Sequence, residues 1–108
     1  MYDADSLPRF ITIGFTGEKD FREVEIDMTK WMAGIPEGVP AIVYVKPETT
    51  DAYRPAVTFE NNIMRWLVSE SDLGAVGGVG KAQLELKSTA KTRKSEIFDV
   101  RVNPAIMR

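Results

Sequence analysis

The residues with the most obvious chemical potential are the glycines and the lysine of LGAVGGVGKAQLEL, residues 73–86. A phosphate-binding loop reads G-x-x-x-x-G-K-[ST], because backbone N–H groups cradle the phosphates, the lysine meets the outer ones and the hydroxyl holds magnesium. Gly80 and Lys81 fit that spacing, but Ala75 stands at the first glycine position and Ala82 at the hydroxyl position. The residues that follow alternate as in a strand, whereas the motif must lead into a helix. We therefore predict a loop that uses glycine for positive φ or close backbone approach, and no nucleotide site.

Other catalytic chemistry is poorly represented in the composition. Histidine and cysteine are both absent, which removes the commonest general base, the commonest metal ligand and all thiolate chemistry. Carboxylates are the plentiful catalytic type, and those weighed here are Glu18, Asp20, Glu23, Glu25, Asp27, Glu70 and Asp72. Acids that alternate along a strand usually form its solvated face, and no calcium-binding loop pattern occurs. The sequence thus predicts no catalytic residue, cofactor or metal, and a hydrolase is the least favoured class.

Charge and hydropathy exclude further classes of partner. The net charge is −2, but residues 81–108 hold seven Lys/Arg against three Asp/Glu. Because these cations are interleaved with strand-like apolar positions, we interpret them as a solvated sheet face and turn, not as a nucleic-acid site. No run approaches the roughly 18 apolar residues of a membrane span, and the first residues do not resemble a signal peptide. We expect a soluble chain.

Aromatic residues allow one ligand hypothesis. Trp31, Tyr44, Tyr53 and Trp66 have the large apolar area and polar edge on which a sugar ring stacks. Tyr44 and Trp66 lie within strand-like runs, where core packing is their expected role. Trp31 and Tyr53 lie in connections and are predicted to be exposed aromatic contacts. A carbohydrate-binding module that recognises a bacterial surface glycan is therefore the alternative function.

The apolar residues mostly alternate with polar ones, which is the period of a β-strand. In the first such run Ile11, Ile13 and Phe15 are expected to share one face. Residues 41–46, AIVYVK, are apolar on both faces, which predicts the central strand of a sheet. The pattern predicts about seven strands, at residues 9–15, 21–27, 41–46, 56–60, 63–69, 81–87 and 95–102.

Turn-forming residues separate these strands. The pair Asn61–Asn62 predicts a tight hairpin, because Asn tolerates the positive φ that a short hairpin demands. One short helical turn is expected near residues 28–33, capped by Asp27 or Thr29 and ended by Gly34. This segment is too short to be an independent helix.

The fold class predicted is all-β, an antiparallel immunoglobulin-like β-sandwich, with a small barrel as the second choice. A chain of 108 residues has room for a single domain, residues 1–108, of which residues 1–7 are polar enough to be loose.

An ordered series of short signatures carries a family resemblance over nearly the whole chain: ITIGFTGE, IDMTKW, VYVKP, NNIMRWLVSESD, GGVGKAQLEL and KSEIFDVRVNPAI. In this order the chain resembles small proteins encoded among the tail and baseplate genes of phages and prophages of Gram-positive bacteria. The resemblance implies an amino-terminal β-sandwich, a structural role in the virion and no catalytic residues. Members of that group in some cases carry a helical or fibre-like extension, and whether this chain continues past Arg108 is open.

The function implied by the resemblance is a non-catalytic virion module of the tail, baseplate or fibre, present in the host cytoplasm before assembly. Its expected partners are other virion proteins and copies of itself, in a symmetric homo-oligomer such as a trimer. The expected contacts are exposed strand edges and an interaction loop whose candidate residues are Asp72, Leu73, Val76 and Lys81.

Overall fold

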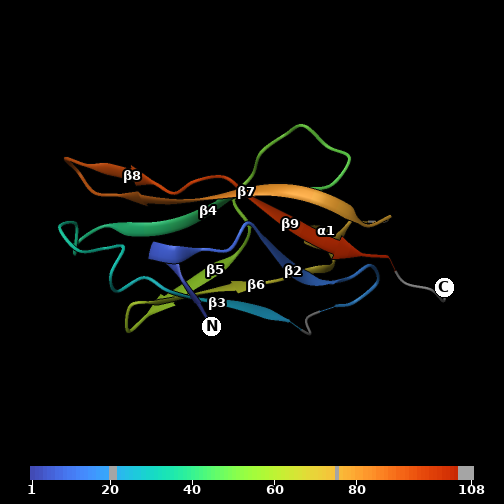
Figure 1. Cartoon of the computed structure of the whole chain (residues 1–108), viewed down its shortest axis with the longest axis horizontal. Coiled ribbons are helices and arrows are strands. Elements are labelled where there is room, and N and C mark those ends of the chain that lie inside the picture. Colours follow the sequence, from blue (N-terminus) through green and yellow to red (C-terminus); the bar gives the residue numbers. More distant parts are fainter. Residues whose placement is uncertain (20–21, 75, 105–108) are drawn as a thin grey trace.

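The computed structural model describes residues 1–19, 22–74 and 76–104. Asp20, one of the candidate carboxylates, and Ala75, at the first glycine position of the phosphate-loop pattern, lie outside the described residues. Strands are the main regular structure of the described residues (Figure 1). The elements are β1 (Tyr2–Asp3), the short 3-10 helix η1 (Ala4–Ser6), β2 (Phe10–Phe15), β3 (Glu23–Asp27), β4 (Val39–Val45), β5 (Val57–Glu60), β6 (Ile63–Leu67), the single-turn α1 (Glu70–Leu73), β7 (Gly78–Lys87), β8 (Thr92–Lys94) and β9 (Phe98–Asn103). Each of the seven predicted strands is present.

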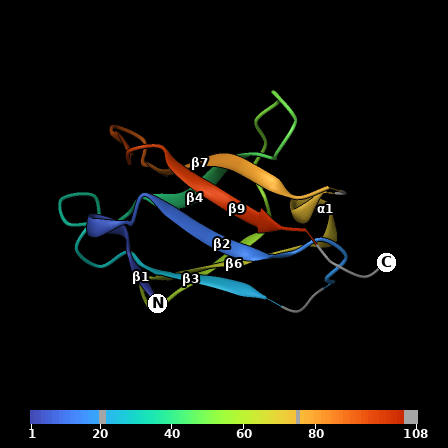
Figure 2. The same cartoon turned by 45° about the vertical axis from the view of Figure 1, so that its right-hand side comes forward.

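The strands form two sheets that pack as a sandwich (Figures 1 and 2). One sheet has the order β1-β3-β6-β5, and the other has the order β2-β9-β7-β4 with β8 also paired to β7. The predicted sandwich is confirmed. The sheets are mixed, however, because β1 pairs with β3 and β2 pairs with β9 in parallel. The remaining strand pairs are antiparallel, as predicted.

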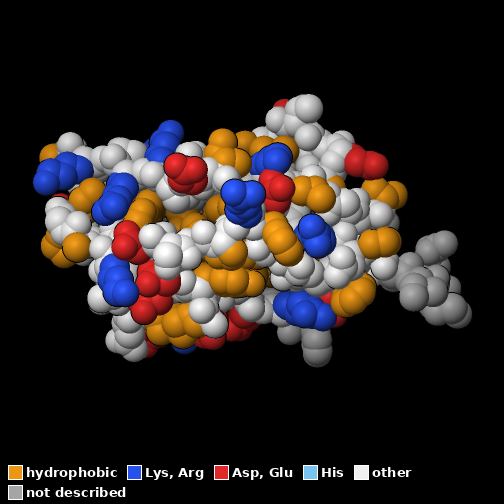
Figure 3. Space-filling model, viewed as in Figure 1, with side chains coloured by type: hydrophobic (Ala, Val, Ile, Leu, Met, Phe, Trp, Pro, Cys, Tyr) orange, Lys and Arg blue, Asp and Glu red, His pale blue; other side chains and the backbone are white. Residues whose placement is uncertain are grey.

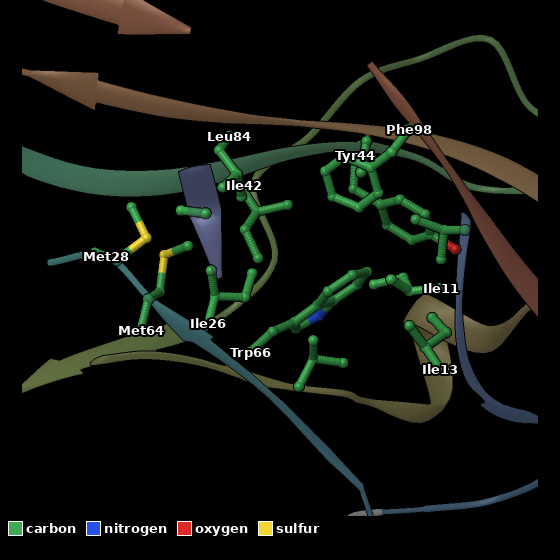
Figure 4. Close-up of a cluster of buried hydrophobic side chains, with 14 of the residues drawn as sticks. Ile11, Ile13, Ile26, Met28, Ile42, Tyr44, Met64, Trp66, Leu84 and Phe98 are labelled. Carbon is green, nitrogen blue, oxygen red and sulfur yellow. The ribbon is translucent and has the colours of Figure 1, made fainter. Parts of the chain in front are cut away.

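The core lies between the two sheets and is built mainly from alternate residues of β2, β3, β4, β6, β7 and β9 (Figure 4). Trp66 on β6 and Tyr44 on β4 are fully buried, with ring centroids 5.0 Å apart in an edge-to-face arrangement. Such pairs add about 1 kcal/mol to the burial of two large rings. The alternation predicted for residues 82–86 is confirmed, because Ala82, Leu84 and Leu86 all face this core.

β4 lies at a sheet edge, so the prediction that it is the central strand is wrong. β7 holds the central place, since it pairs with β4, β8 and β9. The outward residues Ala41 and Val43 are only half-buried. Arg54 donates a hydrogen bond to Glu85, and Glu85 pairs directly with Ala41 across the ladder. The Arg54 side chain therefore crosses this side of β4, which accounts for the apolar residues there.

A β-bulge in β2 overturns a second prediction. Thr12 pairs with Arg101 and Gly14 with Val102, so Ile13 is an extra residue in the ladder. Ile11 and Ile13 are buried, whereas Phe15 is exposed. The expected common face of these three residues is therefore wrong for Phe15, because the extra residue shifts the alternation.

Both predicted turns are confirmed. Asn61 and Asn62 have φ of 54° and 63° and join β5 to β6 in a two-residue hairpin. In the predicted helical turn the N–H of Met32 donates to the carbonyl of Met28 at 2.9 Å. The Asp27 carboxylate accepts from the N–H of Thr29 at 3.0 Å, which satisfies one of the free donors of that turn.

The first residues of the chain form short elements that contact the rest of the sandwich. β1 pairs with the end of β3, and the Asp3 carboxylate accepts from the N–H of Asp5 at 2.9 Å at the start of η1. Ala4 is buried against the core. Within the described part of the chain, no helix is long and apolar enough to cross a membrane.

Candidate interaction surface

A buried carboxylate organises the segment before the glycine stretch. Ser69 and Asp72 form a capping box around α1, in which each side chain accepts from the backbone N–H of the other residue. Asp72 Oδ2, which accepts from the Ser69 N–H, also accepts from Trp66 Nε1 at 3.0 Å. The other oxygen, Oδ1, accepts from the Tyr53 hydroxyl. The Tyr44 hydroxyl donates to the Asp72 carbonyl at 3.0 Å. Asp72 therefore links α1, β6, β4 and the β4–β5 connection.

The tyrosines of this network are held in their neutral form. Burial raises the pKa of Tyr44 above its ordinary value, and the negative charge of Asp72 raises it further. Burial also raises the pKa of Tyr53, followed by the hydrogen bond to Asp72 and by its charge. Both hydroxyls thus remain protonated donors at neutral pH. The arrangement is a structural clamp.

The predicted interaction loop divides into a buried part and an exposed part. Asp72 is 2% exposed and Leu73 is fully buried, so these two residues are not surface contacts. Val76 is 58% exposed, and Lys81 is exposed and paired with Asp99. Asp72 and Leu73 are buried because the capping box places them in α1. Its sequence signal is Ser69 followed three residues later by Asp72, which marks a helix start that the strand pattern did not reveal.

The glycine stretch serves backbone geometry. Gly77 has φ of 78°, and a Cβ there would lie 3.0 Å from the carbonyl of Val102 and from the nitrogen of Pro104. Gly80 has no positive φ, but its Cβ would overlap the Val45 carbonyl. The prediction of positive φ or close backbone approach is confirmed. β7 follows, with no helix.

The two aromatic residues predicted to be exposed do not form a platform. Trp31 is 4% exposed, because the turn that carries it packs into the core and the Arg93 guanidinium lies 5.4 Å from its ring centroid. Arg93 also donates to the Trp31 carbonyl at 2.7 Å. Tyr53 is half-buried, and its hydroxyl is bonded to Asp72. In the parts of the chain that the structure describes, these rings offer no face for sugar stacking.

A surface hollow of about 490 Å³ lies between the amino-terminal segment and the connection from β8 to β9. Its charged residues have both signs, with Arg9, Arg93 and Lys94 opposed by Asp5 and Glu96. This mixture does not select a class of ligand. Across residues 1–19, 22–74 and 76–104, no group of three or more carboxylates is placed to hold a metal ion.

The outer face of the five-stranded sheet carries exposed apolar side chains on β2 and β7, the two strands that flank β9. Phe10 and Phe15 on β2 are 45% and 42% exposed, and Val79 on β7 is 51% exposed. Between them Arg101 on β9 pairs with Val79 and places its guanidinium 4.2 Å from the Phe10 ring centroid. We call Phe10, Phe15, Val79 and Arg101 the outer strip. In Figure 3 hydrophobic and charged side chains intermingle over the region of β2 and β9.

An ion pair fastens the β4–β5 connection to the same sheet and makes a pH-dependent contribution. The hydrogen bond from Arg54 Nη2 at 2.9 Å lowers the pKa of Glu85 below 4.5, and Lys87 lowers it further. A carboxylate whose pKa is lowered by folding stabilises the fold above its unfolded-state pKa, and this contribution is lost as pH falls through the folded-state value.

We expect Glu85→Gln to lower the free energy of unfolding by about 1 kcal/mol at pH 7, a value kept small because Arg54 is half exposed. The loss should shrink at acid pH, because the Glu85 carboxyl protonates first in the unfolded chain and then, at its lowered pKa, in the folded chain. Urea unfolding of both chains at pH 7 and near pH 3 measures the difference. An equal loss at the two pH values would contradict the assignment.

Comparison with known proteins gives no relative: no family model and no curated protein matches this chain. The resemblance to phage tail and baseplate proteins therefore remains an expectation from the sequence.

Proposed function

We propose that this chain is a non-catalytic structural module of a phage or prophage virion, associated with the tail, baseplate or fibre, that works by binding other protein chains. The observation that carries the proposal is the outer strip. The residues on the solvated face of a sheet are normally polar. Exposed apolar groups on such a face therefore mark interaction sites. The order of sequence signatures supplies the virion context.

The chemistry of the outer strip suits a protein partner. Aromatic residues and arginine are enriched at protein interfaces, and they contribute much of the binding energy when a partner excludes water. The stacking of Arg101 on Phe10 keeps the guanidinium in place before binding, which reduces the ordering cost. The surface is thus largely formed before a partner arrives.

Analysis of purified particles tests this role. We expect mass spectrometry of virions from the phage or prophage that encodes the chain to find it in the tail fraction, in a fixed ratio to the other tail proteins. Immunogold labelling should mark the tail or baseplate in electron micrographs. Absence of the chain from intact, infective particles would overturn the proposed function.

A surface variant links that result to the outer strip. Val79→Asp removes an apolar contact and sets a carboxylate opposite Arg101 in the expected interface, so incorporation into particles should fall by at least about tenfold. Ile97→Asp is the matched control, because Ile97 is as exposed as Val79 but lies outside the strip. Equal incorporation of both variants would exclude the outer strip as the contact surface.

A further inference from the structure

β5 ends one sheet and leaves backbone groups without a partner strand. Glu60 pairs with Ile63 across the two-residue turn, and the N–H of Leu67 donates to the carbonyl of Ala56 at 3.1 Å. In an antiparallel ladder the residues alternate between hydrogen-bonded and non-hydrogen-bonded pairs. Val57 and Phe59 are therefore non-hydrogen-bonded positions, whose N–H and C=O groups point away from β6 toward the open edge.

The edge strands of the other sheet are protected. On β4 the N–H and C=O of Tyr44 are hydrogen-bonded to Tyr53, on the side of β4 away from β7. Because the hydrogen-bonding direction alternates along a strand, the backbone groups of Ile42 and Pro40 point to that same side. Pro40 has no N–H to offer. On β2 the bulge at Ile13 distorts the edge, and the N–H of Phe15 donates to Glu18 Oε1 at 2.7 Å. Proline, bulges and capping of this kind discourage strand addition.

β5 lacks such protection between Val57 and Phe59. These two residues pair with the buried Trp66 and Met64, so their side chains point toward the inside of the sandwich. Phe59 is nevertheless 39% exposed, because no strand lies beyond β5 to cover it. The edge thus combines free backbone groups with an uncovered aromatic ring that faces the core side. Both features favour the addition of a further strand at this edge.

We propose that β5 pairs antiparallel with β5 of a second copy across a two-fold axis at Thr58, which joins the two four-stranded sheets into one. This contact deepens the proposed assembly role and rests on it for its biological meaning. The β5–β5 pairing specifies which strand edge joins two copies of the chain. The contact is isologous, so it generates a dimer and not a trimer.

The register about Thr58 is self-complementary. Val57 of each copy lies opposite Phe59 of the other, so their free backbone groups exchange hydrogen bonds and a β-branched residue covers an aromatic ring. Thr58 meets its own copy on the outer face, which is a favourable cross-strand pair. Glu60 falls opposite Ala56, so no like charges face each other. Pro55 and the Asn61–Asn62 turn confine the pairing to this short stretch.

Sedimentation equilibrium from low micromolar to low millimolar protein tests the contact. We expect a monomer–dimer equilibrium, and Thr58→Lys should weaken it at least tenfold by placing two like charges opposite each other. Thr58 is exposed, and thermal unfolding checks that each variant remains folded. Thr50→Lys is the matched control, because it adds the same charge at an exposed threonine of the β4–β5 connection. It should leave the dimer unchanged.

Charge reversal makes the test specific for this register. Thr58→Glu alone should also be monomeric, whereas an equal mixture of Thr58→Lys and Thr58→Glu should restore a dimer. Amide exchange at Val57 and Phe59 should slow with rising wild-type concentration. A wild-type chain that stays monomeric, a trimer, or a dimer indifferent to Thr58→Lys would overturn the inference. Because particle composition is measured separately, a chain found in virions but monomeric in solution overturns this contact alone.

Discussion

Replacing Asp72 by alanine is expected to lower the free energy of unfolding by about 3–5 kcal/mol, a large part of the stability of a domain of this size. The carboxylate is buried and accepts from Trp66 Nε1, the Tyr53 hydroxyl and the N–H of Ser69. Alanine leaves all three donors without their acceptor. Each buried donor without a partner costs about 1–3 kcal/mol, and water that enters the space reduces the sum. Urea unfolding followed by tryptophan fluorescence measures the loss.

A graded control distinguishes the network from simple loss of volume. Tyr53→Phe removes one donor and leaves the other two bonded, so its cost should be about 1 kcal/mol. Tyr53→Phe combined with Asp72→Ala should cost less than the sum of the separate changes, because the two groups contact each other. If Asp72→Ala costs no more than Tyr53→Phe, the clamp contributes little to the fold. The tyrosine variant remains informative if the alanine variant does not fold.

Alternation along the chain was sufficient to locate the strands that build the core. Residues such as Val24 and Ile26 on β3 are separated by charged neighbours that face solvent, and this period of two survives in the folded chain. β1 and β8 escaped the prediction because they span only two and three residues. Strands that short acquire their conformation from the neighbour with which they pair, not from a pattern of their own.

Tertiary context explains the predictions that failed. The sequence of β4 is apolar on both faces, but that pattern reflects what covers the two faces and not which strands flank it, and β4 lies at an edge of its sheet. Trp31 follows a charged strand and precedes a glycine, which suggests a surface turn, yet Met28 and Met32 carry that turn into the core. Neither outcome is encoded in local periodicity.

The outer strip could not be found from sequence for a related reason. Phe10 adjoins the alternating run of β2, and Phe15 matches its apolar period until the bulge at Ile13 reverses the faces. Phe15 is therefore indistinguishable from a core residue until the strand pairing is known, whereas the alternation already places Phe10 on the face opposite Ile11. The β5 edge is hidden in the same way, since its free backbone groups follow from the register and not from residue types.

Gly80→Ala is expected to destabilise the chain by about 3 kcal/mol or more, through a mechanism unrelated to hydrogen bonding. Gly80 lies in the central strand β7, and an added Cβ would overlap the Val45 carbonyl and lie 3.0 Å from the Tyr44 ring. The obstacle is backbone of the neighbouring strand β4, so relief requires the two paired strands to separate. Thermal unfolding monitored by circular dichroism measures the effect.

Gly38→Ala is the matched comparison for this prediction. A Cβ at Gly38 would lie 2.6 Å from Leu86 Cδ1, 2.7 Å from Leu86 Cγ and 3.1 Å from an Ile35 methyl group, all of them side-chain atoms. Rotation of these side chains relieves the overlap without moving the ladder, so the cost should be about 1–2 kcal/mol. Equal losses for the two variants would show that β4 and β7 yield as easily as a leucine side chain, and would contradict the requirement for glycine in the GVGK segment.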